Sequence, residues 1–344
     1  MQTLPRELFG EIADHLVDGF PISQINQSFR DHLLKHIKPA NNRIDFEKWF
    51  KDGKVLNIVR SRHLWLKRWR SKCFEKACLG GHFSTFHLGL RLIDNKKYDG
   101  LNNAYMGGHT HIIDYLEEMG EIATNCASIF SNGKIEIIEK NKHIALQNIQ
   151  NAYQGVLMSG NLAAFDLVES WITGLYYPCP DSFYYAALGE NLDIVNILIS
   201  RGCNDWESLL DGACAIKNKQ LIDLAISKGA CNYQKALGYA CASWDLDTVR
   251  YLHSLCENDH QYFVNDDNLN VAIMSGNLDL VTYVADFDRG DGPIHEACII
   301  RDFRIIEFLL KKIYTGKRYQ EAIFAIEEYA RDDPIFREFL SSIK

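Results

Sequence analysis

Apolar and polar positions follow one another along most of this chain in a pattern that predicts short amphipathic helices joined in pairs. In the clearest copy, Ile305-Ile306 and Leu309-Leu310 repeat at i, i+1, i+4 and i+5, which places them on one face of a helix. The preceding helix begins near Pro293, which suits a first helical turn, and carries the small pair Ala297-Cys298, against which another helix can pack closely. Such a pair cannot bury its apolar face alone, so the pattern predicts neighbouring copies.

Nine copies of this frame follow one another, and each has a turn between its two helices. The turns lie 25 to 32 residues apart, and the second-helix apolar stripes repeat with them. The nine turns are Gly81-His82, Gly108-His109, Gly133-Lys134, Gly160-Asn161, Glu190-Asn191, Lys217-Asn218, Trp244-Asp245, Gly276-Asn277 and Arg301-Asp302. Gly120, Gly202 and Gly229 follow three of the second helices, where a residue in the left-handed region commonly ends a helix.

The segment Pro293-Ile294-His295-Glu296-Ala297 and the helix after it resemble the core of an ankyrin repeat. The resemblance implies an all-α fold, an ankyrin-like helical-repeat solenoid of about nine short repeats over residues 75–313. Because an ankyrin repeat has ~33 residues, we expect most of its β-hairpin finger to be missing here. Residues 314–344 carry apolar residues at helical spacing and predict a two-helix C-terminal cap.

Residues 1–40 are not a repeat, but they predict two helices. The segment opens with Leu4-Pro5-Arg6-Glu7-Leu8, and Leu8, Ile12 and Leu16 share one face at i, i+4 and i+8. With Phe29-Arg30 further on, the segment resembles an F-box. The resemblance implies a substrate-recruiting adaptor of a cullin-type (SCF-like) ubiquitin ligase, whose Skp-type linker subunit would dock on Leu4, Pro5, Leu8, Ile12 and Leu16. The alternative is an N-terminal cap that closes the exposed end of the repeats.

Residues 41–74 combine tryptophans with a high density of lysine and arginine. Such a segment could bind nucleic acid, or it could form linker helices whose rings pack on the first repeat while the charges stay in water. Residues 1–72 contain 14 Lys and Arg against 8 Asp and Glu, whereas the remainder contains 23 against 37. We expect linker helices, because Leu64, Trp65, Arg68 and Trp69 can place the rings on one helix face. The acidic remainder disfavours nucleic acid as the main ligand and favours a basic protein target. An acidic exterior without any partner is the alternative.

The two residues before each turn are uncharged in all nine frames, although this position often touches the target in ankyrin proteins. The pattern predicts either an apolar groove or an edge that the shortened repeats bury against one another. If it is a groove, the candidate target-binding residues are Met106, Met158, Leu188, Ile216, Met274, Ile299 and Ile300.

Motifs for catalysis, cofactor binding and metal binding are missing, so we expect a protein that is not an enzyme and needs no cofactor. Four of the ten cysteines follow an alanine at the same repeat position, Cys78, Cys214, Cys241 and Cys298, as expected for small buried residues rather than disulfides. Reduced thiols, no membrane span and no signal segment predict a cytoplasmic or nuclear protein.

Two functions remain open from the sequence. One is the ubiquitin-ligase adaptor that the F-box resemblance implies. Because F-box segments joined to degenerate ankyrin arrays are associated with large DNA viruses, the resemblance also implies a viral protein acting in the host cytoplasm or nucleus. The other is an ankyrin-repeat scaffold or inhibitor that sequesters a partner protein without ubiquitin chemistry. Exposure of the Leu8, Ile12 and Leu16 face would distinguish a docking segment from a cap.

Overall fold

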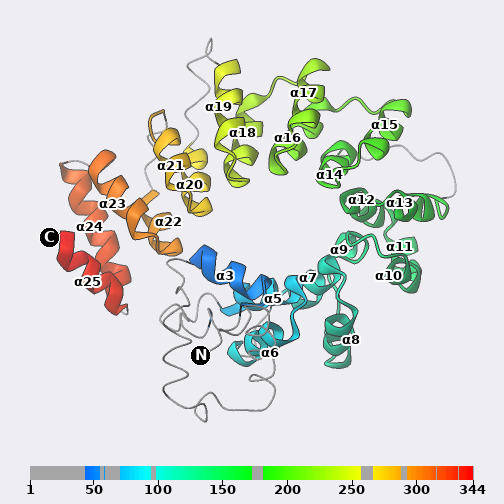
Figure 1. The fold of residues 1–344 in the computed structure, drawn as a ribbon, viewed down its shortest axis with the longest axis horizontal. Coiled ribbons are helices and arrows are strands. Elements are labelled where there is room, and N and C mark those ends of the chain that lie inside the picture. The colour runs from blue at the N-terminus through cyan, green and yellow to red at the C-terminus, as the bar shows by residue number, and fades with distance from the viewer. Residues whose placement is uncertain are drawn as a thin grey trace, which may run out of the picture. The chain divides into compact units, whose positions relative to one another are not determined.

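The computed structural model describes residues 43–54, 58, 70–93, 98–172, 181–256, 266–287, 293–314, 316–331 and 333–343. All regular elements in these ranges are α-helices, which confirms the predicted all-α class for the part of the chain described. The chain divides into two compact units, Met1–Ala152 and Tyr153–Lys344, and Figure 1 shows the helices of each. The boundary falls within α12 (Ile149–Ser159).

In the first unit, alternate helices pack against each other in series, α3 on α5, α5 on α7 and α7 on α9. The second helix of a pair, such as α6 or α8, packs against its own first helix. The helices are α3 (Arg43–Lys51), α5 (Arg70–Gly80), α6 (Phe83–Leu92), α7 (Gly100–Gly107), α8 (Thr110–Glu118), α9 (Cys126–Phe130), α10 (Ile135–Lys140) and α11 (Lys142–Gln147).

The second unit repeats this arrangement, with α14 on α16, α16 on α18, α18 on α20 and α20 on α22. We call these five helices the first-helix row. The helices are α13 (Leu162–Glu169), α14 (Ser182–Leu188), α15 (Leu192–Ser200), α16 (Trp206–Ala215), α17 (Lys219–Ser227), α18 (Tyr233–Ala242), α19 (Leu246–Leu255), α20 (Asp266–Ser275), α21 (Leu278–Val284), α22 (Pro293–Ile300), α23 (Phe303–Lys312), α24 (Lys317–Ala330) and α25 (Pro334–Ile343). Figure 1 shows each of α15, α17, α19 and α21 beside its partner in the row.

All nine turn residues aligned from the sequence have left-handed backbone, with φ between 56° and 74°. Five are glycines, but Glu190, Lys217, Trp244 and Arg301 are not. Left-handed backbone costs a residue with a Cβ roughly 1–2 kcal/mol, so packing on both sides must impose this turn. The expected left-handed residues after second helices are also confirmed, because Gly120, Gly202 and Gly229 have φ of 87°, 89° and 107°.

The residue after each turn starts the second helix. In six of the nine frames its side chain accepts hydrogen bonds from backbone N–H groups two or three residues later, and a cap of this kind stabilises a helix by about 1 kcal/mol. These caps are Asn161, Asn191, Asn218, Asp245, Asn277 and Asp302. The turn sequence therefore both ends one helix and begins the next.

The same position also connects neighbouring helix pairs. His109 Nε2 donates to the carbonyl of Leu79 at 2.9 Å, and Lys134 Nζ donates to the carbonyl of Gly108 at 2.7 Å. In the second unit, Asn191 Nδ2 donates to the carbonyl of Gly160 at 2.8 Å. Each bond satisfies a carbonyl at the preceding pair's turn, where the end of a helix leaves such groups without an intrahelical partner.

The core lies between the two helices of each pair and the pair that follows. The predicted second-helix stripes are buried, including Ile112, Ile194, Val249 and Ile305. So are the cysteines of the repeated Ala-Cys pairs, Cys78, Cys214, Cys241 and Cys298. Burial raises the pKa of the Cys78 thiol, and it raises the pKa of the Cys214 thiol to about 12. The small side chains allow the close approach of successive first helices.

The structure contains a further turn of this kind, at Gly53, within the segment predicted as linker helices. Its φ is 69°, and it lies 28 residues (81 − 53) before Gly81, a spacing within the range of the other frames. The ring of His82 lies against Gly53 as the ring of His109 lies against Gly81. The helix before it, α3, packs on α5, so it takes the place of another first helix.

At the other end, α24 and α25 lie in the segment predicted as a C-terminal cap. Asp333 begins α25, since its Oδ1 atom accepts hydrogen bonds from Ile335 N at 3.0 Å and Phe336 N at 3.4 Å. The same atom lies 2.7 Å from Nη2 of Arg301, the residue of the last turn. Both side chains are buried, so this ion pair connects the final helix pair to α25.

Candidate protein-binding surface

The residues before each turn, predicted to line either an apolar groove or a buried edge, are only partly accessible. Met106 in the first unit and Met274 in the second are each 39% exposed. Met158, Leu188, Ile216 and Ile299 are half-buried. Ile300 is 1% exposed, because α24 packs against α22, and we therefore leave it out of the candidate surface.

Close backbone packing buries part of this edge where the turns at Gly160 and Glu190 meet. A Cβ added at Gly189 would lie 2.2 Å from the carbonyl oxygen of Leu157, and one at Gly160 would lie 1.9 Å from that of Gly189. Contacts this short leave no room for a side chain between the two turns. Part of this edge is thus buried between neighbouring helix pairs.

Two tyrosines from helices that are not neighbours in the row meet over the helix between them. The ring centroids of Tyr184, on α14, and Tyr239, on α18, are 5.6 Å apart, although α16 separates the two helices in the row. Gly212 on α16 makes this approach possible, since a Cβ there would lie 2.6 Å from the carbonyl oxygen of Tyr184. Both rings are half-buried, and burial raises the pKa of Tyr184.

The residue before that glycine, Asp211, is buried and has a lysine as its counter-ion. Its Oδ2 atom lies 2.5 Å from Nζ of Lys235, and the side chains are 3% and 58% exposed, respectively. Burial raises the pKa of Asp211, although Lys235 opposes this effect. The hydrogen bond with Asp211 in turn raises the pKa of Lys235. The Lys235 ammonium also lies 5.9 Å from the centroid of the Tyr239 ring, within the range of a cation–π contact.

These four residues, Tyr184, Asp211, Lys235 and Tyr239, form what we call the tyrosine–aspartate site. It brings together three consecutive helices of the row. None of these residues was predicted from the sequence. The sequence does show one regularity for two of them, because Tyr184 and Asp211 both lie six residues before a turn, at Glu190 and at Lys217.

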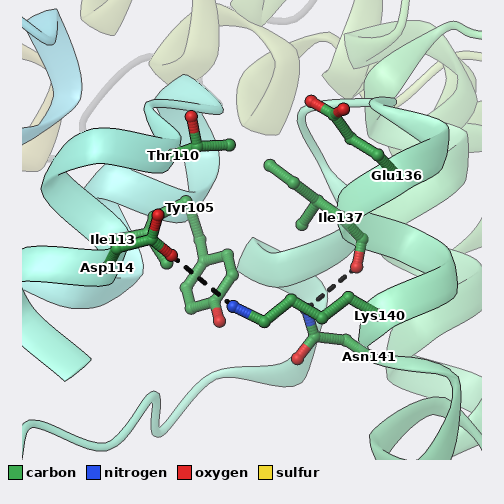
Figure 2. A pocket seen from close by; sticks show the side chains of 8 residues that line it. All are labelled: Tyr105, Thr110, Ile113, Asp114, Glu136, Ile137, Lys140 and Asn141. Carbon is green, nitrogen blue, oxygen red and sulfur yellow. Dashed lines mark hydrogen bonds and ion pairs between the residues drawn. The ribbon is translucent and has the colours of Figure 1, made fainter. Parts of the chain in front are cut away.

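The first unit contains a separate pocket of about 240 Å³ between α8 and α10, with Tyr105 of α7 at its base. Figure 2 shows Lys140 across from Asp114, at 3.6 Å, and Asn141 Nδ2 donating to the carbonyl of Ile137. The Tyr105 hydroxyl is also hydrogen-bonded, to Glu117. Ligand pockets usually measure ~300–1,000 Å³, so a small pocket whose polar groups bind one another is a poor ligand site.

The predicted docking residues of the F-box-like segment, Leu4, Pro5, Leu8, Ile12 and Leu16, lie outside the described residues. Within the described part, no group of three or more His, Cys, Asp or Glu side chains is placed to hold a metal ion. None of the described helices combines the length and apolar character needed to cross a membrane.

A scan against protein-family models and a search of curated proteins find no match to the chain.

Proposed function

We propose that this chain is a helical-repeat solenoid of the ankyrin type whose first-helix row binds a protein target. The observation that carries the proposal is the recurrence of one turn geometry at the nine aligned positions, together with the serial packing of first helices on one another. Stacked repeats of this kind present an extended surface built from many helices. The tyrosine–aspartate site supports protein binding, because tyrosine is enriched at the centres of interfaces.

We further propose that the chain recruits this target as an adaptor of a cullin-type ubiquitin ligase. This step rests on the resemblance of residues 1–40 to an F-box. In that role, Leu8 and Ile12 would bury their side chains against a Skp-type linker subunit. Replacing both by aspartate would put two charges into a contact that must exclude water, and the binding should be lost.

The test is co-purification of the full-length chain with a Skp-type linker subunit. Wild type should retain the subunit, whereas the Leu8→Asp/Ile12→Asp variant should lose it and keep the wild-type circular dichroism spectrum. Ile122→Asp is the matched control, because this isoleucine is 81% exposed and lies in the first unit, so the substitution should not affect binding. If wild type does not bind the subunit, or if the double variant loses its helical signal, residues 1–40 are a structural cap. The scaffold or inhibitor function would then replace the adaptor function.

A further inference from the structure

The tyrosine–aspartate site points to the chemistry of the target. We propose that Asp211, Tyr184 and Tyr239 form a receptor for an arginine side chain of a basic partner protein, and that Lys235 occupies this receptor until the partner displaces it. The inference rests on the proposed protein-binding function of the first-helix row and adds the kind of side chain that the row recognises.

The two partners of the Asp211–Lys235 ion pair differ strongly in exposure. The aspartate side chain is 3% exposed, whereas the lysine side chain is 58% exposed. A buried carboxylate needs a cation close by, but the cation does not have to come from the same chain. Lys235 reaches the carboxylate from the solvent side on a long, flexible stem, so it can leave without any change in the backbone.

The surroundings of the Asp211 carboxylate suit a guanidinium better than an ammonium. A planar guanidinium can donate two parallel hydrogen bonds to a carboxylate and stack on aromatic rings at the same time. Tyr184 and Tyr239 provide two such rings, 5.6 Å apart and contributed by different helices. The ammonium of Lys235 lies 5.9 Å from the Tyr239 centroid, so one of the chain's own cations already lies beside this ring.

The charge of the row around the site also favours a basic ligand. Across α14, α16, α18, α20 and α22, Lys235 is the one lysine or arginine. The described side chains of these helices include three acidic ones, Glu207, Asp211 and Glu296. When a partner displaces Lys235 from Asp211, the acidic residues of the row attract a basic segment and repel an acidic one.

The experiment measures binding of a fluorescein-labelled nona-arginine peptide to the full-length chain by fluorescence anisotropy. Nona-lysine and nona-glutamate peptides serve as comparisons. Wild type should bind nona-arginine more tightly than nona-lysine and should not bind nona-glutamate. Asp211→Asn should weaken nona-arginine binding by at least ~10-fold, because it removes the buried charge that the guanidinium would meet. Asp247→Asn is the matched control, since that carboxylate is 95% exposed in the same unit, and it should change the affinity less than ~2-fold.

A second variant keeps the test decisive if Asp211→Asn does not fold, which thermal unfolding of each variant would reveal. Lys235→Gln removes the internal competitor and should tighten nona-arginine binding by a few-fold, since a larger fraction of the chain is then ready to bind. The inference is overturned if Asp211→Asn and Asp247→Asn weaken binding equally, or if Lys235→Gln binds no more tightly than wild type. A protein target captured equally well by wild type and Asp211→Asn would leave the proposed function intact and overturn the arginine receptor alone.

Discussion

The buried ion pair between Arg301 and Asp333 gives the sharpest test of how the last repeat is held to the C-terminal helices. The perturbation is Arg301→Gly, because glycine suits the left-handed turn, where φ is 62°. Glu190→Gly is the matched control, since Glu190 has the same turn position, with φ of 56°, and an exposed side chain. Both substitutions relieve the same backbone strain, but Arg301→Gly also removes one partner of a buried ion pair.

The expected magnitudes follow from these two terms. Relief of left-handed strain should stabilise the chain by about 1 kcal/mol in either variant. Breaking a buried pair costs about 3–5 kcal/mol, because the remaining charge is left without its counter-ion. The side chains of Arg301 and Asp333 are 2% and 8% exposed, so solvent cannot replace the lost partner. We therefore expect Glu190→Gly to raise the free energy of unfolding by about 1 kcal/mol and Arg301→Gly to lower it by about 2–4 kcal/mol.

Helix pairs that pack mainly on their neighbours can unfold in parts, so the assay should report on the C-terminal helices themselves. Native-state hydrogen exchange of the amides in α24 and α25 meets this need. Arg301→Gly should speed their exchange by about 30-fold or more, since 1.4 kcal/mol corresponds to a factor of ten, and Glu190→Gly should leave them unchanged. The double variant Arg301→Gly/Asp333→Asn should lose less free energy of unfolding than the two single variants lose together. Unchanged exchange in Arg301→Gly would refute the idea that this pair holds the cap in place.

Two further predictions concern the turns and the buried thiols. Gly160→Ala should destabilise the second unit by about 2–4 kcal/mol in urea unfolding, because its Cβ would lie 1.9 Å from the carbonyl oxygen of Gly189 at a φ of 62°. The control Gly202→Ala should cost about 1 kcal/mol, since its φ is 89° but nothing lies within 4 Å, and equal losses would contradict this account. Cys214 has a folded pKa of about 12 against an ordinary value of 9.0, so its contribution to stability is complete below pH 9 and is lost as the pH rises toward 12. Cys214→Ala should therefore lower the free energy of unfolding at both pH 8 and pH 10, but the decrease should be about 1 kcal/mol smaller at pH 10. An equal decrease at the two pH values would show that the thiol does not keep its proton in the folded state.

Features that repeat within one helix pair could be predicted from the sequence. The apolar stripe, the small pair and the turn residue recur at fixed offsets, and each is determined by contacts within one repeat period. The turn at Gly53 was missed because Trp49-Phe50 occupies the place of the Ala-Cys pair, four and three residues before the turn. Its left-handed conformation depends on the neighbouring pair, whose His82 ring lies against it.

The candidate site was harder to predict, because it depends on contacts between repeats. Tyr184 and Tyr239 are 55 residues apart (239 − 184), and their rings meet because Gly212 lets the intervening helix lie close to α14. Ile300 shows the reverse case. Its position relative to the turn matches that of Ile216, which is half-buried, but Ile300 is buried and lies on α22, against which the helix α24 packs. Sequence periodicity therefore gives the place of a residue within its helix pair but not how exposed that residue is.

Site-specific photo-crosslinking, in extract of the cells where the chain occurs, can show whether the first-helix row binds a protein target. Benzoyl-phenylalanine replaces Tyr184 or Met274 of the first-helix row in two variants, and Tyr251 of α19 in a third. Tyr251 is 36% exposed and lies on a second helix, so it reports on surface contacts outside the row. The account predicts that the same protein is crosslinked from Tyr184 and Met274, but not from Tyr251. Crosslinking of that protein from Tyr251 alone, or equally from all three positions, would contradict a target-binding first-helix row.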